Sequence, residues 1–161
     1  MGFLFSLFVW VATILATAAA SSAFANFSRS CTGIGLVRRF ILCATCCSPE
    51  DDGTYTESAN ELNLNLCVGL DQTSGRMRWE VYGKFANYCA NCTIHASTGE
   101  ADHLLTCSCE PLAGGRGRVR STLNLDEGIA NDCGILKCTG GIAVPPRNGS
   151  RNQLPYSINM A

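Results

Sequence analysis

The sequence has few of the features on which large classes of protein depend. Only 16% of its residues are charged, and the formal net charge of -1 gives no global attraction to nucleic acid or to an anionic membrane. Histidine occurs only as His95 and His103, so no histidine-based acid–base or nucleophile arrangement is visible. No window has the apolar spacing of a long amphipathic helix. These absences favour a non-enzymatic, all-β protein without a nucleic-acid partner.

The chain begins with an apolar run from Phe3 to Ala20, followed by the small-residue motif Ala23-Phe24-Ala25. This pattern predicts a signal peptide over 1–25, although no Lys or Arg precedes the run. The alternative is a signal anchor, because about 18 apolar residues can span a bilayer. No second run of that length follows, so we expect a secreted, extracellular protein with no membrane contact after cleavage.

Cysteine is abundant, since the 136 residues left after cleavage (161 − 25) carry all 11 cysteines. Thiols oxidise outside the cytosol, so disulfide bonds are the expected state. The count is odd, and one cysteine is therefore free, capped or paired with another chain, as in a disulfide-linked dimer. Cys89-x-x-Cys92 and Cys107-x-Cys109 have a spacing that can also ligate zinc. Secretion favours disulfides there, and we expect no metal and no cofactor.

One set of landmarks occurs twice in the mature chain. Phe27-x-x-x-Cys31 returns as Phe85-x-x-x-Cys89, and Leu42-x-x-x-Cys46 returns as Leu105-x-x-x-Cys109, at offsets of 58 and 63 residues. Each half continues with Leu-Asn-Leu followed by Asn or Asp, and closes on Gly-x-apolar-basic. The common order indicates two tandem copies, about 26–80 and 81–138.

Short alternating segments predict strands in both halves, and 126–131 has the character of a single helical turn. Neither half has enough apolar positions for a core of its own, so we expect the halves to share strands, with disulfides making up the deficit. After Cys138 the pattern stops, and 139–161 is expected to be a disordered tail. The expected strand segments are 34–46, 62–68, 77–82, 104–109, 118–125 and 135–138.

These landmarks, together with the stretch from Ile129 to Lys137, resemble the cyanovirin-N homology (CVNH) family of small all-β lectins. The resemblance covers 27–138. It implies one domain, 26–138, made of two pseudo-symmetric repeats that exchange β-hairpins. It also implies a carbohydrate site at each end, often for mannose-type glycans, so the expected partners are glycans or glycoproteins.

The resemblance also implies one disulfide in each repeat, Cys31–Cys46 and Cys89–Cys109. Cys92 and Cys107 lie inside the second pair and would face each other on an antiparallel hairpin, which suggests a third disulfide. The sequence assigns no pairing to the remaining cysteines, which are Cys43, Cys47, Cys67, Cys133 and Cys138.

Site one is the better supported of the two implied sites. Asn131 is its candidate sugar ligand, because a side-chain amide offers both a donor and an acceptor to vicinal hydroxyls. The alternative is that Asn131 and Gly134 only form the turn. Cys47 and Cys133 stand where the family commonly has acidic side chains, and a disulfide between them would alter or remove sugar binding. The other residues carried over to site one are Asn26, Arg29, Ser30 and Asp132.

Site two has fewer polar groups, because Leu70 stands at the position of Asn131 and the loop 111–114 lacks polar side chains. Tyr88 can stack on a sugar ring or serve only in packing.

Arg116, Arg118 and Arg120 share a strand face, which is a solvated face or an anion patch. The other residues carried over to site two are Gly69, Asp71, Gly83, Lys84, Asn87 and the 110–114 loop.

A competing hypothesis is a secreted, cysteine-rich scaffold on the same fold that has lost sugar binding and contacts a protein. A hydrolase is disfavoured because no catalytic constellation is visible. The glycosylation sequons begin at Asn26, Asn91 and Asn148.

Overall fold

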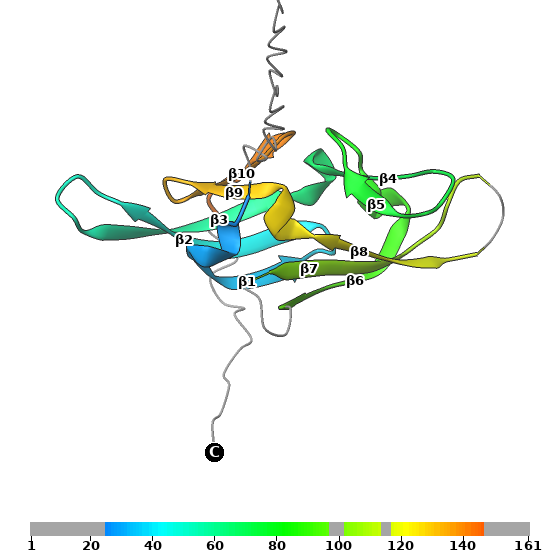
Figure 1. The fold of residues 1–161 in the computed structure, drawn as a ribbon, viewed down its shortest axis with the longest axis horizontal. Coiled ribbons are helices and arrows are strands. Elements are labelled where there is room, and N and C mark those ends of the chain that lie inside the picture. The colour runs from blue at the N-terminus through cyan, green and yellow to red at the C-terminus, as the bar shows by residue number, and fades with distance from the viewer. Residues whose placement is uncertain (1–24, 97–101, 114–116, 147–161) are drawn as a thin grey trace, which may run out of the picture.

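The computed structural model describes residues 25–96, 102–113 and 117–146, and this part of the chain consists of β-strands joined by loops and short 3-10 turns. Figure 1 shows an elongated molecule with several strands along its long axis. None of the described segments forms a helix long and apolar enough to cross a membrane. Almost all of the expected signal peptide, 1–24, lies outside the described residues.

Repeat one begins with a single 3-10 turn and a three-stranded antiparallel sheet of order β1-β2-β3, and ends with a second 3-10 turn and a β-hairpin. Its elements are η1 (Phe27–Arg29), β1 (Cys31–Val37), β2 (Ile41–Pro49), β3 (Tyr55–Asn63), η2 (Leu64–Leu66), β4 (Val68–Leu70) and β5 (Met77–Trp79).

Repeat two has the same order of elements with one strand more. A three-stranded sheet of order β6-β7-β8 is followed by a sheet of order β11-β10-β9. The elements are η3 (Phe85–Asn87), β6 (Cys89–Ala96), β7 (His103–Cys109), β8 (Val119–Asn124), η4 (Leu125–Glu127), β9 (Ile129–Asp132), β10 (Ile135–Cys138) and β11 (Gly141–Ile142).

Each repeat places its hairpin against the sheet of the other repeat. The Leu136 amide of β10 donates to the Asn60 side chain of β3 at 3.1 Å. At the position that corresponds by the internal repeat, the Met77 amide of β5 donates to the Ser121 hydroxyl of β8 at 2.8 Å. Because all four groups are buried, these hydrogen bonds fix the exchange of hairpins that the sequence predicts.

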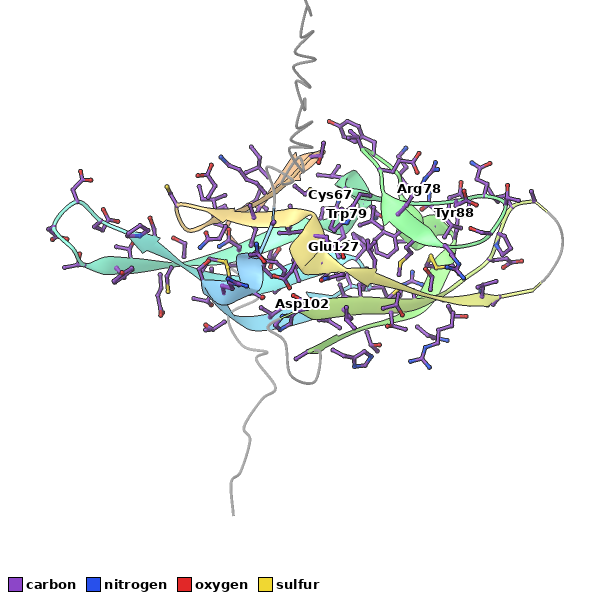
Figure 2. All side chains as sticks on the ribbon, in the orientation of Figure 1. Cys67, Arg78, Trp79, Tyr88, Asp102 and Glu127 are labelled. Carbon is purple, nitrogen blue, oxygen red and sulfur yellow. A yellow bond between two sulfur atoms is a disulfide. The ribbon has the colours of Figure 1, made fainter. Side chains whose placement is uncertain are left out.

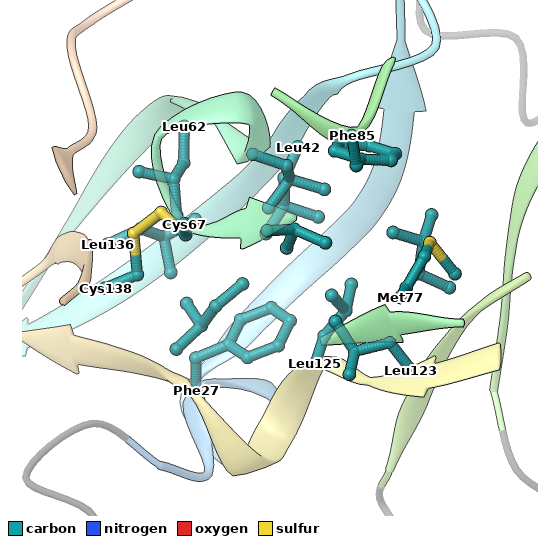
Figure 3. Close-up of a cluster of buried hydrophobic side chains, with 14 of the residues drawn as sticks. Phe27, Leu42, Leu62, Cys67, Met77, Phe85, Leu123, Leu125, Leu136 and Cys138 are labelled. Carbon is teal, nitrogen blue, oxygen red and sulfur yellow. A yellow bond between two sulfur atoms is a disulfide. The ribbon is translucent and has the colours of Figure 1, made fainter. Parts of the chain in front are cut away.

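The repeated apolar landmarks form one shared core. Phe27 and Phe85, and likewise Leu42 and Leu105, are fully buried. Figure 3 shows Phe27, Leu42 and Phe85 in one cluster with side chains from both hairpins. Since burying such a side chain stabilises the fold by about 1.5–3 kcal/mol, the core explains why the landmarks recur at matched positions.

Eight cysteines form disulfides. Cys31–Cys46, Cys89–Cys109 and Cys92–Cys107 are present, the same pairs that the sequence suggests. The first two join residues that stand directly opposite each other in the sheets, with Cα atoms 4.0 Å apart. The fourth, Cys67–Cys138, has no counterpart in the sequence analysis.

The structure corrects several expected boundaries. The segment 34–46 is two strands, because a tight turn at 38–40 interrupts it. The turn expected at 126–131 is the short 3-10 turn η4 followed by β9, and 62–68 contains the 3-10 turn η2. The side chains of Asn63 and Asn124 cap η2 and η4 by accepting the amides of Asn65 and Asp126, which stabilises both turns.

The expectation of a disordered tail from residue 139 onward does not hold for 139–146. β11 pairs with β10, and Val144 exchanges two backbone hydrogen bonds with Glu61 of β3. Ala143 is buried, so the segment contributes to the core. The rest of the expected tail, 147–161, lies outside the described residues.

Candidate functional site

Site one lies where η1, the end of β2 and the β9–β10 hairpin meet. Asn26, in the left-handed conformation, leads into η1, and its amide donates to the Asp126 carbonyl at 2.8 Å. The Ser28 amide donates to the buried Asp126 carboxylate at 3.0 Å. These contacts attach the start of repeat one to repeat two and set the position of Arg29 and Ser30.

Asn131 connects the three segments of the site rather than pointing into solvent. Its side-chain nitrogen donates to the Ser30 hydroxyl at 2.9 Å and to the Cys47 carbonyl at 2.8 Å. Both amide hydrogens are therefore used within the protein. The Asn131 side-chain oxygen is buried and has no hydrogen-bond partner within the described residues. Asn131 is a positioning residue in this structure. It does not present both of its amide groups to a ligand, contrary to the expectation from the sequence.

The hairpin turn beside Asn131 is formed by Cys133 and Gly134, with φ of 48° and 81°. Two left-handed residues between paired strands are typical of a type I′ turn. A Cβ at Gly134 would lie 3.2 Å from that of Ser48, and the Gly134 carbonyl accepts a hydrogen bond from Asn60 at 2.8 Å. Gly134 is thus a structural part of site one.

The polar groups that site one offers to solvent come from Asn26, Arg29, Ser30 and Asp132, which are all exposed. Asp132 forms an ion pair with Lys137. The Lys137 ammonium, by hydrogen bond and charge, holds the pKa of the Asp132 carboxyl below its usual value. Asp132 therefore gives site one an ionised carboxylate, although cysteines occupy the two positions, 47 and 133, where the family commonly has acidic side chains.

Cys47 and Cys133 are free thiols, so the disulfide considered between them is absent. Cys133 is exposed at the tip of the turn, and Cys47 is partly buried. Cys43 is also free, which makes three free cysteines where the odd count required one. Site one is consequently open in this structure.

Site two is partly closed by its own loops. The Asp71 carboxylate accepts hydrogen bonds from the Ser74 amide and hydroxyl and from the Thr73 amide. Those bonds, the largest from Ser74, lower the pKa of Asp71. Leu70, at the position of Asn131, is buried, and Gly69 is buried as well.

The loop after β7 packs against the same hairpin. Pro111 would lie 3.2 Å from a Cβ at Gly75, and the Ala113 amide donates to the Gln72 carbonyl at 3.0 Å. Gly83 packs directly against Gly69. Lys84 is left-handed, like its counterpart Asn26, and its amide donates to the Asn65 carbonyl. The Asp71 carboxylate and the backbone of Gly69, Gly83 and Lys84 are thus engaged within the protein.

A cleft of about 500 Å³ holds the other residues assigned to site two. It brings Asn87 and Tyr88 together with Glu110, which corresponds to Cys47, since the Glu110 amide donates to the Tyr88 carbonyl as Cys47 does to Ser30. Figure 2 shows Tyr88 at the same end as Arg78 of β5. The remaining lining residues are Arg39, Ala86, Cys89, Ala90, Pro111, Leu112 and Arg118.

Sequence reasoning missed Arg39. The β1–β2 turn belongs to repeat one and the rest of the cleft to repeat two, so no short motif connects them. The four cysteines of the zinc alternative are in disulfides, and the described residues contain no group of three or more possible metal ligands.

Figure 1 places the turn between β9 and β10 and the β4–β5 hairpin toward opposite ends of the long axis. Two similar repeats, exchanged hairpins and an open polar surface at one end define a small disulfide-stabilised all-β domain. The CVNH domain matches residues 27–137. The chain therefore belongs to the CVNH family, which is a family of lectins and not of enzymes.

Solved structures agree with this assignment. The chain is similar to GzCVNH of Gibberella zeae, with 31% identity, a TM-score of 0.57 and coverage of 70% of this chain and 96% of that one. It is also similar to microvirin, solved as a mannobiose complex, with 26% identity, a TM-score of 0.56 and coverage of 71% and 98%. A MoCVNH3 variant in complex with (N-GlcNAc)4, at 19% identity and a TM-score of 0.54, shares the fold over 71% of this chain and 97% of its own. No curated protein matches the chain.

Proposed function

We propose that the protein is a secreted lectin for mannose-type oligosaccharides and that it binds them at site one. Membership of the CVNH family supports sugar binding, and the mannobiose complex of microvirin supports the sugar class. Four disulfides favour an oxidising compartment and thereby support secretion.

The observation that carries the proposal is the fixed position of Ser30 between Asn131 and solvent. The Ser30 oxygen accepts a hydrogen bond from Asn131, which leaves its own hydrogen for another acceptor. Within the described residues its acceptor is the Phe27 carbonyl at 3.4 Å, longer than a normal hydroxyl hydrogen bond. Ser30 can therefore donate to a sugar hydroxyl.

Charged residues that are sequence neighbours of Ser30 and Asn131 complete the proposed site. The Asp132 carboxylate can accept hydrogen bonds from two vicinal hydroxyls, and the Arg29 guanidinium can donate to ring or hydroxyl oxygens. Because Asn131, the Cys133–Gly134 turn and Asp126 hold these segments in place, little ordering is needed on binding.

The test is titration of the purified secreted chain with mannobiose. We expect weak but saturable binding, about tenfold weaker after Ser30→Ala or Asp132→Asn, since each loses a hydrogen bond to a charged or oriented group. Asn131→Ala should weaken binding by releasing Ser30 and the Cys47 carbonyl, with the fold retained by circular dichroism. Asp71→Asn, the counterpart of Asp132→Asn, is the matched control and should leave the affinity unchanged. Absence of any signal on a glycan array at high protein concentration would refute the lectin hypothesis.

The alternative, a scaffold that has lost sugar binding, is favoured by one observation: thiols replace the acidic groups at Cys47 and Cys133. The exposed Cys133 thiol also supports a disulfide-linked dimer, which would bring two copies of site one together and raise avidity. Non-reducing electrophoresis of the wild type beside Cys133→Ser tests the dimer. A dimer that persists in the variant would exclude this linkage.

A further inference from the structure

The 500 Å³ cleft, which includes Asn87, Tyr88 and Glu110 of site two, also carries two arginines from different repeats. Arg39 comes from the turn between β1 and β2, and Arg118 from the residue before β8. Both side chains are exposed, and Glu110, 3.9 Å from Arg118, is the facing carboxylate. The charged lining, two guanidinium groups and one carboxylate, has a formal charge of +1 (2 − 1).

The backbone that presents Arg39 is strained. Arg38 and Arg39 have φ of 52° and 67°, so two consecutive non-glycine residues are left-handed. Such residues are disfavoured by contact of the Cβ with the backbone, and they persist where the surroundings demand them. An Asn or Gly would relieve this turn, yet both positions are arginine. As at Cys133–Gly134, the left-handed pair lies in the turn of a β-hairpin, and this turn places Arg39 at the cleft.

The other lining residues are those that a sugar ring requires. Glu110 and Asn87 can accept and donate hydrogen bonds to hydroxyls, whereas Tyr88 and Leu112 offer apolar surface to a pyranose face. The guanidinium groups of Arg39 and Arg118 are suited to bidentate binding of a carboxylate or a sulfate. A cleft of this volume is of the usual size for a small-molecule site.

A second hollow, of about 290 Å³, is lined by residues of β6, β7 and β8. Its lining includes Asn91, next to Ala90 of the first cleft, and Arg120, which shares a strand face with Arg118. Thr93, Thr106 and Ser108 supply hydroxyls there. The two hollows together can therefore hold more than one sugar unit, with a third guanidinium placed for a second acidic group.

We propose that this surface is a binding site for acidic oligosaccharides, with the carboxylate or sulfate of one sugar between Arg39 and Arg118 and a second acidic sugar against Arg120. It is separate from site one, at the other end of the molecule, and does not depend on mannose binding there. The carboxylate and the sulfate share the chemistry of recognition, so both sources are tested.

The experiment is calorimetric or NMR titration of the purified chain with trigalacturonate, with a chondroitin-4-sulfate tetrasaccharide and with uncharged maltotriose. We expect saturable binding of at least one acidic probe, and at least about tenfold weaker binding of maltotriose, because the latter forms no charge-assisted hydrogen bonds. The acidic probe that binds more tightly identifies the source. Binding of neither acidic probe, or equal binding of maltotriose, overturns the proposal.

Two neighbouring arginines provide the decisive comparison. Arg39→Asn should weaken binding of the acidic probe by about tenfold or more, since it removes a bidentate donor. Arg38→Asn removes the same charge from the same turn but not from the cleft lining, and should change the affinity less than about twofold. Asn tolerates the left-handed conformation, so both variants should fold. Equal effects of the two variants would reduce the site to a diffuse electrostatic attraction and overturn it.

The length of the ligand is tested with Arg120→Gln. This variant should weaken binding of trigalacturonate and leave monomeric galacturonate unaffected; equal effects on the two ligands refute the extension along β8. Mannobiose affinity should be the same in Arg39→Asn as in the wild type, and Ser30→Ala should leave trigalacturonate binding unchanged. Failure of the lectin proposal at site one and failure of the acidic site are thereby distinguished.

Discussion

Cys67, which follows η2 in repeat one, is bonded to Cys138, the last residue of β10 in repeat two. The two residues are 71 apart in sequence and are both buried. Figure 3 shows their disulfide within the apolar cluster, beside Leu136. The bond therefore attaches the base of the hairpin that carries Asn131 to the opposite repeat.

Removing this disulfide, by Cys67→Ala with Cys138→Ala, should destabilise the protein by about 4 kcal/mol, because it closes the longest loop of the four and limits the unfolded chain most. Urea unfolding followed by circular dichroism measures the loss. The matched control is Cys92→Ala with Cys107→Ala. That disulfide lies inside Cys89–Cys109 and adds a shorter constraint, so its loss should cost about half as much. A larger loss in the control would contradict the chain-entropy explanation.

Asp126 is predicted to be the most sensitive polar residue of the fold. Its buried carboxylate accepts the amides of Ser28 at 3.0 Å and His103 at 2.8 Å, from opposite repeats. Asp126→Ala removes both of these hydrogen bonds and should destabilise by about 2–4 kcal/mol. Asp126→Asn keeps one acceptor and should cost about half. At the corresponding position, Asn65 accepts one amide, from Ala86, so Asn65→Ala should cost less than Asp126→Ala. Equal urea midpoints for Asp126→Ala and Asp126→Asn would disprove this ranking.

The fold could be predicted from the sequence because its core residues coincide with the repeated landmarks. Phe27 and Phe85 are spaced from Cys31 and Cys89 by the same short element, a 3-10 turn, so the motif and the structure have one cause. Local signals of this kind survive in a single sequence. The same reasoning failed at 139–146, because the β11 pairing depends on β10 and on Glu61 and not on its own composition.

The candidate sites were harder to predict from the sequence because they depend on long-range contacts. Asn131 was identified from its turn, but its role is set by Ser30 and Cys47, residues from the other repeat. Arg39 was not identified, because the other residues that line its cleft, such as Arg118, are distant in sequence. The Cys67–Cys138 pairing was not predicted for the same reason. In each case the residues come from different repeats and meet only where the two repeats pack together.

Gly128 is required by a close approach to an aromatic ring. A Cβ at this position would overlap the indole of Trp79, which is the single tryptophan outside the expected signal peptide. Gly128→Ala should displace the ring, destabilise the protein by about 1–3 kcal/mol and shift tryptophan emission to longer wavelength. Gly35→Ala, on β1, has open space at its Cβ and is the control, with emission unchanged. An unaltered spectrum in Gly128→Ala would show that the ring does not occupy this position in solution.

Cys43 should react slowly with alkylating reagents. Burial, followed by the negative charge of Glu61 on the neighbouring strand, raises the pKa of the Cys43 thiol above its ordinary value. Because the thiolate is the reactive form, the rate of iodoacetamide modification should rise only at a pH above that of an unperturbed cysteine. Glu61→Gln removes the smaller of the two causes, so it should lower the pKa of Cys43 in part and increase the rate at pH 8. Glu57→Gln, which changes the residue facing Cys47, serves as the control and should leave the Cys43 profile unchanged. Site-resolved mass spectrometry gives both profiles, and an identical pH dependence in wild type and Glu61→Gln would exclude the charge as a cause.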